Sequence, residues 1–138
     1  MGASACCCAA PTPHYLGCPP VLCFDGDRAG EKAARRAAER AIPLLKPEKS
    51  LKIISLPDGE DPDSLIKGRG VSAIEELLDE AVHLFEVIWR INTVGVRLET
   101  PEDRAGLEKR LKETAANIKD KTVQRHYLNS FKSRLWDE

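Results

Sequence analysis

The apolar positions of this chain form two short runs, separated by one stretch with helical periodicity. Residues 21–24 (VLCF) and 51–56 (LKIISL) are short and apolar, which is typical of buried parallel strands. Between them, residues 28–45 predict a helix whose apolar face recurs at helical spacing (Ala29, Ala33, Ala37, Ala41 and Leu44). Pro43 predicts the end of this helix. Strand, helix and strand in this order predict a parallel, Rossmann-like βαβ unit, so the carboxyl ends of both strands should share one edge of a sheet.

In the second half of the chain, the apolar residues recur at helical spacing only. Ser72 and Glu75 are spaced as a capping box at the start of an apolar helical face (Ile74, Leu77, Leu78, Ala81, Phe85 and Ile88). The sequence Thr100-Pro101 followed by two acids predicts the start of a second helix, and a third starts near Asp120. Because the joining segments are short, we expect these three helices to form a small antiparallel bundle. The predicted fold class is therefore α/β, with a βαβ unit followed by an α-helical bundle.

The first 20 residues differ in composition from the rest of the chain. They hold four of the five cysteines and no Lys, Arg, Asp or Glu. The cysteine spacing matches no paired zinc-ligand pattern, and the clustering favours a reducing, cytoplasmic setting over a disulfide framework. A lipid anchor at Gly2 stays open, although Cys6 stands where the myristoylation pattern expects Ser or Thr. We expect an unstructured leader over 1–20, a sheet domain over 21–70 and a helical subdomain over 71–138, with strand 21–24 as an unpaired sheet edge.

Overall composition and charge exclude few functions. The chain is 42% hydrophobic and 31% charged, and its net charge of -1 gives no overall field that favours nucleic acid. Aromatic residues make up only 5%, which argues against a surface that stacks many bases. No apolar run approaches the roughly 18 residues of a membrane span, so we expect no membrane association. The chemistry must therefore lie in local clusters of side chains.

Acidic side chains follow each predicted strand. Asp25 and Asp27 come directly after the first strand, and a glycine between them allows a tight turn. The loop after the second strand holds four more acids (Asp58, Glu60, Asp61 and Asp63). Carboxylates at one sheet edge could hold a hard divalent cation such as Mg²⁺, and two such ions about 4 Å apart serve phosphoryl transfer. Acids are also common in ordinary turns, but two acidic loops at one edge favour a metal site.

The predicted helix after Asp27 has a basic surface. It carries five basic residues (Arg28, Lys32, Arg35, Arg36 and Arg40) against Glu31 and Glu39. The helix start could favour phosphate, and the basic face could lie along a nucleic-acid backbone. For any single one of these residues, a solvated helix face with ion pairs one turn apart is the favoured interpretation.

Two segments together closely resemble the Toprim domain of bacterial replicative DNA primases of the DnaG type. They are residues 24–34 (FDGDRAGEKAA) and 56–70 (LPDGEDPDSLIKGRG), and the residues after them resemble the helical subdomain of those primases. The resemblance implies a DNA-directed RNA polymerase that makes RNA primers for DNA replication. Its partners would be a single-stranded DNA template, ribonucleotides and the replicative helicase. The resemblance also implies that Mg²⁺ or Mn²⁺ is held by four aspartates, Asp25, Asp27, Asp61 and Asp63. Asp58 would lie close to these ligands.

Other parts of that family have no counterpart in this sequence. The family's metal site includes a glutamate from an earlier strand, and its zinc-binding and template-binding parts also precede the matching region. A helicase-binding domain follows it. We therefore expect a partial Toprim domain that lacks the family zinc site, binds metal weakly and makes no primers by itself.

Two further functions stay open on the sequence. A phosphatase of the haloacid-dehalogenase type would use Asp25 as the nucleophile and Asp27 as the general acid. It also needs a lysine, for which Lys52 or Lys67 is available, and it leaves the second acidic loop without a role. The other alternative is a non-catalytic helical interaction module that retains a remnant metal site.

Overall fold

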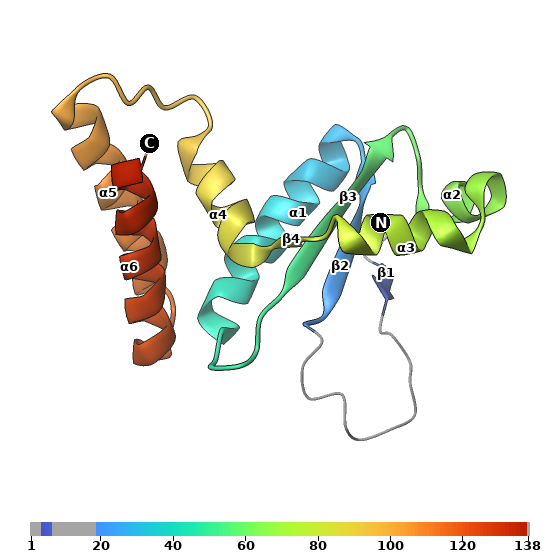
Figure 1. The fold of residues 1–138 in the computed structure, drawn as a ribbon, viewed down its shortest axis with the longest axis horizontal. Helices are drawn as coiled ribbons and strands as arrows, with labels where there is room; N and C mark the ends of the chain where they lie inside the picture. The colour runs from blue at the N-terminus through green and yellow to red at the C-terminus, as the bar shows by residue number, and fades with distance from the viewer. Residues whose placement is uncertain (1–3, 7–18, 138) are drawn as a thin grey trace. The chain divides into compact units, whose positions relative to one another are not determined.

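The computed structural model describes residues 4–6 and 19–137, and Figure 1 shows its elements. Gly2 and most of the expected leader lie outside the described residues. The strands are β1 (Ser4–Cys6), β2 (Val21–Gly26), β3 (Lys52–Asp58) and β4 (Val82–His83). The helices are α1 (Arg28–Ala41), η1 (Ile42–Leu44), α2 (Pro62–Arg69), α3 (Val71–Asp79), α4 (Leu84–Thr93), α5 (Pro101–Ala116) and α6 (Lys121–Asp137).

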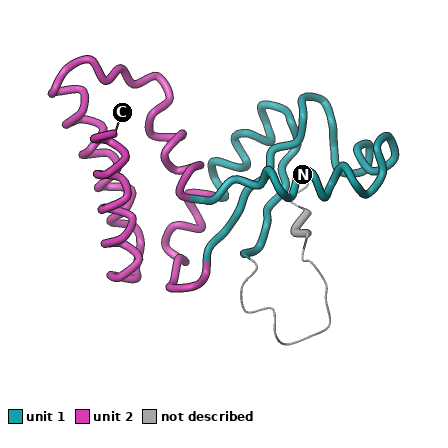
Figure 2. The backbone as a smooth tube through the Cα atoms, viewed as in Figure 1, with its two compact units in different colours: residues 1–37, 50–84 teal, residues 38–49, 85–138 magenta. Residues whose placement is uncertain are grey.

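The chain forms two compact units, which Figure 2 shows in different colours. The described residues within 1–37 and 50–84 form the first, called the sheet unit, and those within 38–49 and 85–138 form the second, called the helical unit. The chain thus passes finally into the helical unit after residue 84, whereas the expected domain boundary lies at residue 70. Within residues 4–6 and 19–137, no helix is both long enough and apolar enough to cross a membrane.

The sheet has the order β1-β2-β3-β4 and contains the predicted parallel pair. Strands β2 and β3 run in parallel from Val21 opposite Lys52 to Gly26 opposite Asp58, with α1 between them in sequence, which confirms the βαβ unit. The expectation of an unpaired edge at β2 is wrong, because β1 pairs with it antiparallel and places Ser4 opposite Cys23. This pairing satisfies backbone groups that an edge strand would otherwise expose.

Helix α1 buries a different face from the predicted one. Ala34 and Ala38 are buried together with Gly30, whereas Ala29 and Ala33 are exposed. Both sets of residues recur every four positions, so periodicity alone does not distinguish them. The glycine decides the orientation, because only a residue without a side chain allows the helix to approach the end of β2 closely. The helix gives way to η1 at its proline, as predicted.

The helix expected from Ser72 onward is interrupted. Helix α3 ends at Asp79, and β4 then pairs with β3 before α4 begins, so that Leu84 N–H donates to the Leu51 carbonyl at 2.9 Å. The predicted capping box is absent, since the N-cap of α3 is Gly70 and no side chain caps the helix. The free backbone groups along β3 explain the break, because β4 satisfies some of them. Helix α2 was not predicted at all.

The helical unit contains the predicted antiparallel helices α5 and α6. Thr100 caps α5 as expected, in a reciprocal capping box with Asp103. The guanidinium of Arg104, near the start of α5, donates to the Leu135 carbonyl at the end of α6, at 3.3 Å. The two helices therefore run in opposite directions. The buried core of this unit contains mostly aliphatic and aromatic side chains from all three helices (Ile88, Trp89, Leu107, Leu111, Ala115, Ile118, Phe131 and Leu135).

Aromatic rings join α4 to α6 in the helical unit. Phe85 stacks on Phe131 with ring centroids 5.0 Å apart, and Tyr127 meets both rings edge-on. Burial raises the pKa of Tyr127 to about 12, so this residue stays neutral at physiological pH and contributes packing. Trp89 is buried in this core, whereas Trp136 near the end of α6 is 83% exposed.

Glu86 of α4 and Arg134 of α6 form a partly buried ion pair that should stabilise the helical unit. Both guanidinium Nη atoms donate to the carboxylate, one at 3.2 Å, and the guanidinium carbon lies 4.8 Å from the centre of the Trp89 ring. The hydrogen bond from Arg134 is the main reason that the pKa of Glu86 lies below its usual 4.5. The ionised form is therefore the one that the folded state favours.

We expect Glu86→Gln to lower the free energy of unfolding by about 2 kcal/mol at neutral pH. Because the pKa of Glu86 is lowered, its contribution is complete above about 4.5 and disappears as the pH falls through the lowered value. Glu108→Gln is the matched control, since the Glu108–Lys112 ion pair is more exposed and should be worth about 0.5 kcal/mol or less. Urea denaturation at several pH values measures both effects, and equal losses in the two variants would contradict the prediction.

Candidate functional site

The carboxyl ends of β2 and β3 lie at the same edge of the sheet, as Figure 1 shows by their arrowheads. Gly26, between Asp25 and Asp27, is the register partner of Asp58 in the second acidic loop. This confirms the prediction that both acidic loops open on one edge. We call the residues from Asp25 to Asp27 and from Asp58 to Asp63 the acidic edge.

A β-bulge brings the two loops together. Phe24 pairs with Ser55 and Gly26 with Asp58, so two steps along β2 correspond to three steps along β3. Two residues of β3, Leu56 and Pro57, therefore lie opposite the single residue Asp25 of β2. A Cβ on Gly26 would lie 2.0 Å from the Pro57 carbonyl oxygen, so this position requires glycine. The glycine thereby allows the backbones of the two loops to touch.

Asp27 holds the start of α1. Its Oδ1 accepts a hydrogen bond from Gly30 N–H at 2.6 Å, and its carbonyl accepts one from Glu31 N–H at 3.0 Å. Gly30 lies so close to the preceding loop that a Cβ there would be 1.9 Å from the Asp25 carbonyl oxygen. The Asp27 carboxylate is therefore fixed in place by the helix that it caps.

Asp61 plays the same part for α2. Its Oδ1 accepts a hydrogen bond from Ser64 N–H at 2.6 Å, and Ser64 Oγ accepts one from Asp61 N–H at 3.1 Å. Hydrogen bonds from Ser64, above all from its backbone N–H, hold the pKa of Asp61 below its usual value. Asp61 is thus ionised at neutral pH. Two loops from different strands each present an aspartate that uses one oxygen as a helix cap.

The remaining acids of the second loop have different surroundings. Asp63 lies in the first turn of α2 and forms an exposed ion pair with Lys67 at 2.7 Å. Glu60 has one buried carboxylate oxygen, Oε2, without a hydrogen-bond partner. A buried carboxylate oxygen of this kind is costly unless a proton or a cation satisfies it. An all-oxygen set of donors at this edge fits a hard divalent cation.

The acidic side chains do not form a closed ligand cage. Among the residues that the structure describes, no three His, Cys, Asp or Glu side chains are grouped closely enough to hold a metal ion. The structure therefore brings together the two loops that hold Asp25, Asp27, Asp61 and Asp63, without grouping these side chains around one point. The lysines considered for a phosphatase gain no support, since Lys52 pairs with Val21 at the far end of β2 and Lys67 with Asp63.

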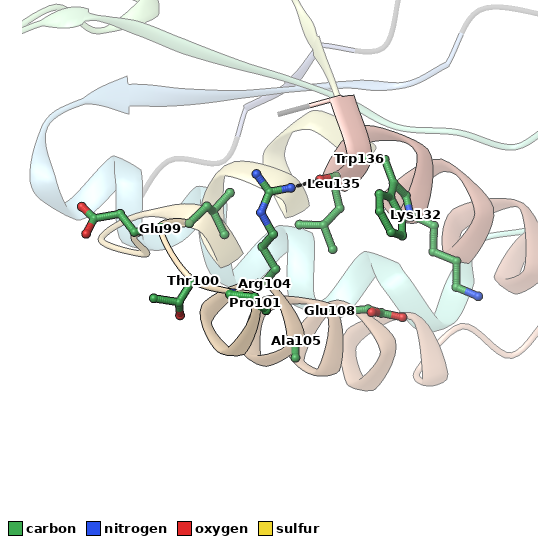
Figure 3. Close-up of a pocket in the computed structure, with 10 residues that line it drawn as sticks. Glu99, Thr100, Pro101, Arg104, Ala105, Glu108, Lys132, Leu135 and Trp136 are labelled. Atoms are coloured by element: carbon green, nitrogen blue, oxygen red, sulfur yellow. Dashed lines mark hydrogen bonds between the residues drawn. The ribbon is translucent and has the colours of Figure 1, made fainter.

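A pocket that the sequence analysis did not predict lies in the helical unit (Figure 3). It has a volume of about 670 Å³ and lies between the start of α5 and the end of α6. Figure 3 shows Arg104 hydrogen-bonded to Leu135, with Lys132 and Trp136 beside them. None of the acids predicted as metal ligands lines this pocket. The only sequence signal was an apolar residue, Trp136, at the end of a polar helix.

Comparison with known proteins relates the acidic edge to one family. Residues 18–66 match the Toprim-like family. The DNA primase of Rickettsia bellii is 40% identical over 116 residues, which are 84% of this chain and 19% of that protein. The DNA primase of Escherichia coli is 41% identical over 87 residues, which are 63% of this chain and 15% of that protein. The chain thus spans about one fifth or less of the relatives it matches.

Solved structures agree with this relationship. The catalytic core of the Escherichia coli primase matches with a TM-score of 0.74 at 33% identity, over 83% of this chain and 37% of that chain. A DnaG primase catalytic domain bound to single-stranded DNA matches with a TM-score of 0.73 at 31% identity, over 86% and 37%. Sequence and fold agree over both units of the chain. The chain therefore belongs to the bacterial DNA primases of the DnaG type, as part of their catalytic core with the later portion of the Toprim domain.

Proposed function

We propose that this chain contributes the acidic edge to a DNA primase, an enzyme that joins ribonucleotides into primers on a single-stranded DNA template. The register that places Gly26 opposite Asp58 carries the proposal, because it brings the two acidic loops of the Toprim part side by side. The chain matches only 19% of the length of the Rickettsia bellii primase. We therefore include the replicative helicase as a partner, and a cytoplasmic location, in the same proposal.

The proposed ligands of Mg²⁺ or Mn²⁺ are Asp25, Asp27, Asp61 and Asp63, with Glu60 as a neighbour whose buried oxygen lacks a partner. A divalent cation held there would neutralise charge on a phosphoryl group during nucleotidyl transfer. The chain's own contribution is orientation. The starts of α1 and α2 fix the carboxylates of Asp27 and Asp61, and both helix ends partly offset the mutual repulsion of the acids.

Metal-dependent stabilisation tests the site. We expect millimolar Mg²⁺ or Mn²⁺ to raise the melting temperature of the chain, by an amount that corresponds to roughly 1.4 kcal/mol when the ion exceeds its Kd tenfold. The double variant Asp25→Asn/Asp61→Asn should lose this response. Asparagine caps helices as well as aspartate does, so the fold should survive the change.

Asp79→Asn/Asp137→Asn is the matched control, because it removes two exposed acids that do not belong to the acidic edge. This control should keep the full metal response. A response that survives in the Asp25/Asp61 variant would contradict the ligand assignment. A native chain without any metal response would contradict it as well.

Because the described acids form no closed cage, we expect no template-dependent ribonucleotide incorporation by this chain alone, and measurable incorporation would overturn that expectation.

A helical interaction module is the second candidate function. The pocket between α5 and α6 and the exposed Trp136 favour it, since solvent-exposed tryptophan beside a hollow is typical of protein contacts. This candidate predicts that Mg²⁺ and Mn²⁺ leave the melting temperature unchanged. The metal titration therefore separates it from the primase proposal.

A further inference from the structure

Four basic residues of α1 form a regular row that the site described above does not use. Arg28, Lys32, Arg36 and Arg40 follow one another at intervals of four residues, which places successive members about 6 Å apart along the helix axis. The row is therefore about 18 Å long. It begins at Arg28, directly after Asp27 of the acidic edge. All four side chains are exposed.

This row lies on the side of α1 that faces away from the buried face. Gly30, Ala34 and Ala38 are buried and also recur every four residues. Since they are displaced from the basic row by two positions, the two rows are about 200° apart around the helix. Ala29 and Ala33 are exposed next to the basic row, and their small side chains leave room for a ligand to approach it.

The row carries charge that the fold does not neutralise. Helix α1 has five basic and two acidic residues, which leaves three net positive charges. Arg35 and Glu39 each take part in an interaction of their own. Within residues 19–137, none of Arg28, Lys32 and Arg36 forms an ion pair. Regularly spaced, unpaired cations on one helix face fit a ligand with regularly spaced anionic groups.

We propose that the basic row of α1 binds the sugar–phosphate backbone of a single-stranded nucleic acid and leads the strand to or from the acidic edge. The proposed function supplies the direction, since a strand on this row would have one end at Asp27. A row made of basic side chains alone predicts binding to phosphates without base preference. The ligand is therefore a polyanion recognised by charge, and its affinity should depend strongly on salt.

The test is a salt titration of DNA binding by the full chain. The probe is fluorescein-labelled oligodeoxythymidylate of about 20 nucleotides, followed by fluorescence anisotropy with EDTA present, over about 25 to 200 mM NaCl. The triple variant Arg28→Gln/Lys32→Gln/Arg36→Gln should bind at least tenfold more weakly at about 50 mM NaCl. Its plot of log K against log salt should be shallower by about 2, since each lost single-strand phosphate contact contributes about 0.7.

Two further variants make the result specific. Lys109→Gln/Arg110→Gln/Lys119→Gln removes the same charge from exposed positions of the helical unit and should bind DNA like the native chain. Arg28→Lys/Arg36→Lys keeps the charge of the row and should retain binding. Unchanged circular dichroism of the triple variant Arg28→Gln/Lys32→Gln/Arg36→Gln excludes misfolding as the cause of its weaker binding. Equal losses in both triple variants, or no DNA binding by the native chain, would overturn the proposal.

The same chains are also tested with vesicles that contain phosphatidylserine. Binding to vesicles without binding to DNA would overturn the proposal in favour of a membrane surface. Because EDTA removes divalent cations, the titration reads the basic row independently of the acidic edge. A native chain that binds DNA but shows no metal response would instead refute the proposed function and leave the basic row in place.

Discussion

Replacing Gly30 by alanine should destabilise the sheet unit by about 3 kcal/mol, whereas the same change at Gly106 should be neutral or stabilising. Both glycines lie inside helices, α1 and α5. At Gly30 the new methyl group would lie 1.9 Å from the Asp25 carbonyl oxygen, which is backbone and cannot rotate away. At Gly106 nothing lies within 4 Å of the added carbon, and alanine is the better helix former by up to about 1 kcal/mol.

Urea denaturation followed by circular dichroism measures this difference. The Gly30 variant should unfold at a lower urea concentration than the native chain, and the Gly106 variant at the same or a higher one. The Gly30 variant should also lose its metal response, because the end of β2 must move to admit the methyl group. Similar midpoints for the two variants would show that the close approach of α1 to Asp25 is not required.

Leu107→Ala should destabilise the helical unit by about 3 kcal/mol. The Leu107 side chain is completely buried in α5, so its truncation removes apolar contacts and leaves a cavity that the neighbouring helices can fill only in part. Val94→Ala is the matched control. Its side chain is 79% exposed, and its loss should cost about 0.5 kcal/mol or less.

Thermal and urea unfolding of both variants, followed through the tryptophan fluorescence of the helical unit, measure this second effect. Trp89 is buried in the same core, so its emission reports on the unfolding of that unit. A Leu107 variant as stable as the Val94 variant would mean that the core around α5 collapses without loss. That result would contradict the close packing expected of a small helical bundle.

The sequence predicted the order of the main elements but not how each is placed. Local patterns and capping residues predict three features correctly: the βαβ unit, the cap at Thr100 and the start of α6 near Asp120. They do not predict the buried face of α1, since alanines recur every four positions on two of its faces. Strands β1 and β4 are only three and two residues long, and they exist because β2 and β3 offer unsatisfied backbone groups.

The candidate site was predictable in its location more than in its detail. Two acidic loops after parallel strands must share an edge, which the pairing of Gly26 with Asp58 confirms. Asp61 and Ser64 have the spacing of a capping box, but the acids around them predict a loop, whereas in the structure Asp61 is the N-cap of α2. The burial of the Glu60 carboxylate oxygen depends on how the loop packs in the folded chain, so it could not be predicted from a local sequence pattern.

Because Asp27 and Asp61 each cap a helix, backbone amide signals can report on metal binding at the acidic edge. In each residue, the carboxylate proposed as a ligand also accepts an amide proton, from Gly30 in one loop and from Ser64 in the other. A charge bound to the second oxygen would polarise the carboxylate and shift the resonance of that amide proton. Two backbone signals, one for each strand end, therefore report separately on the two halves of the edge.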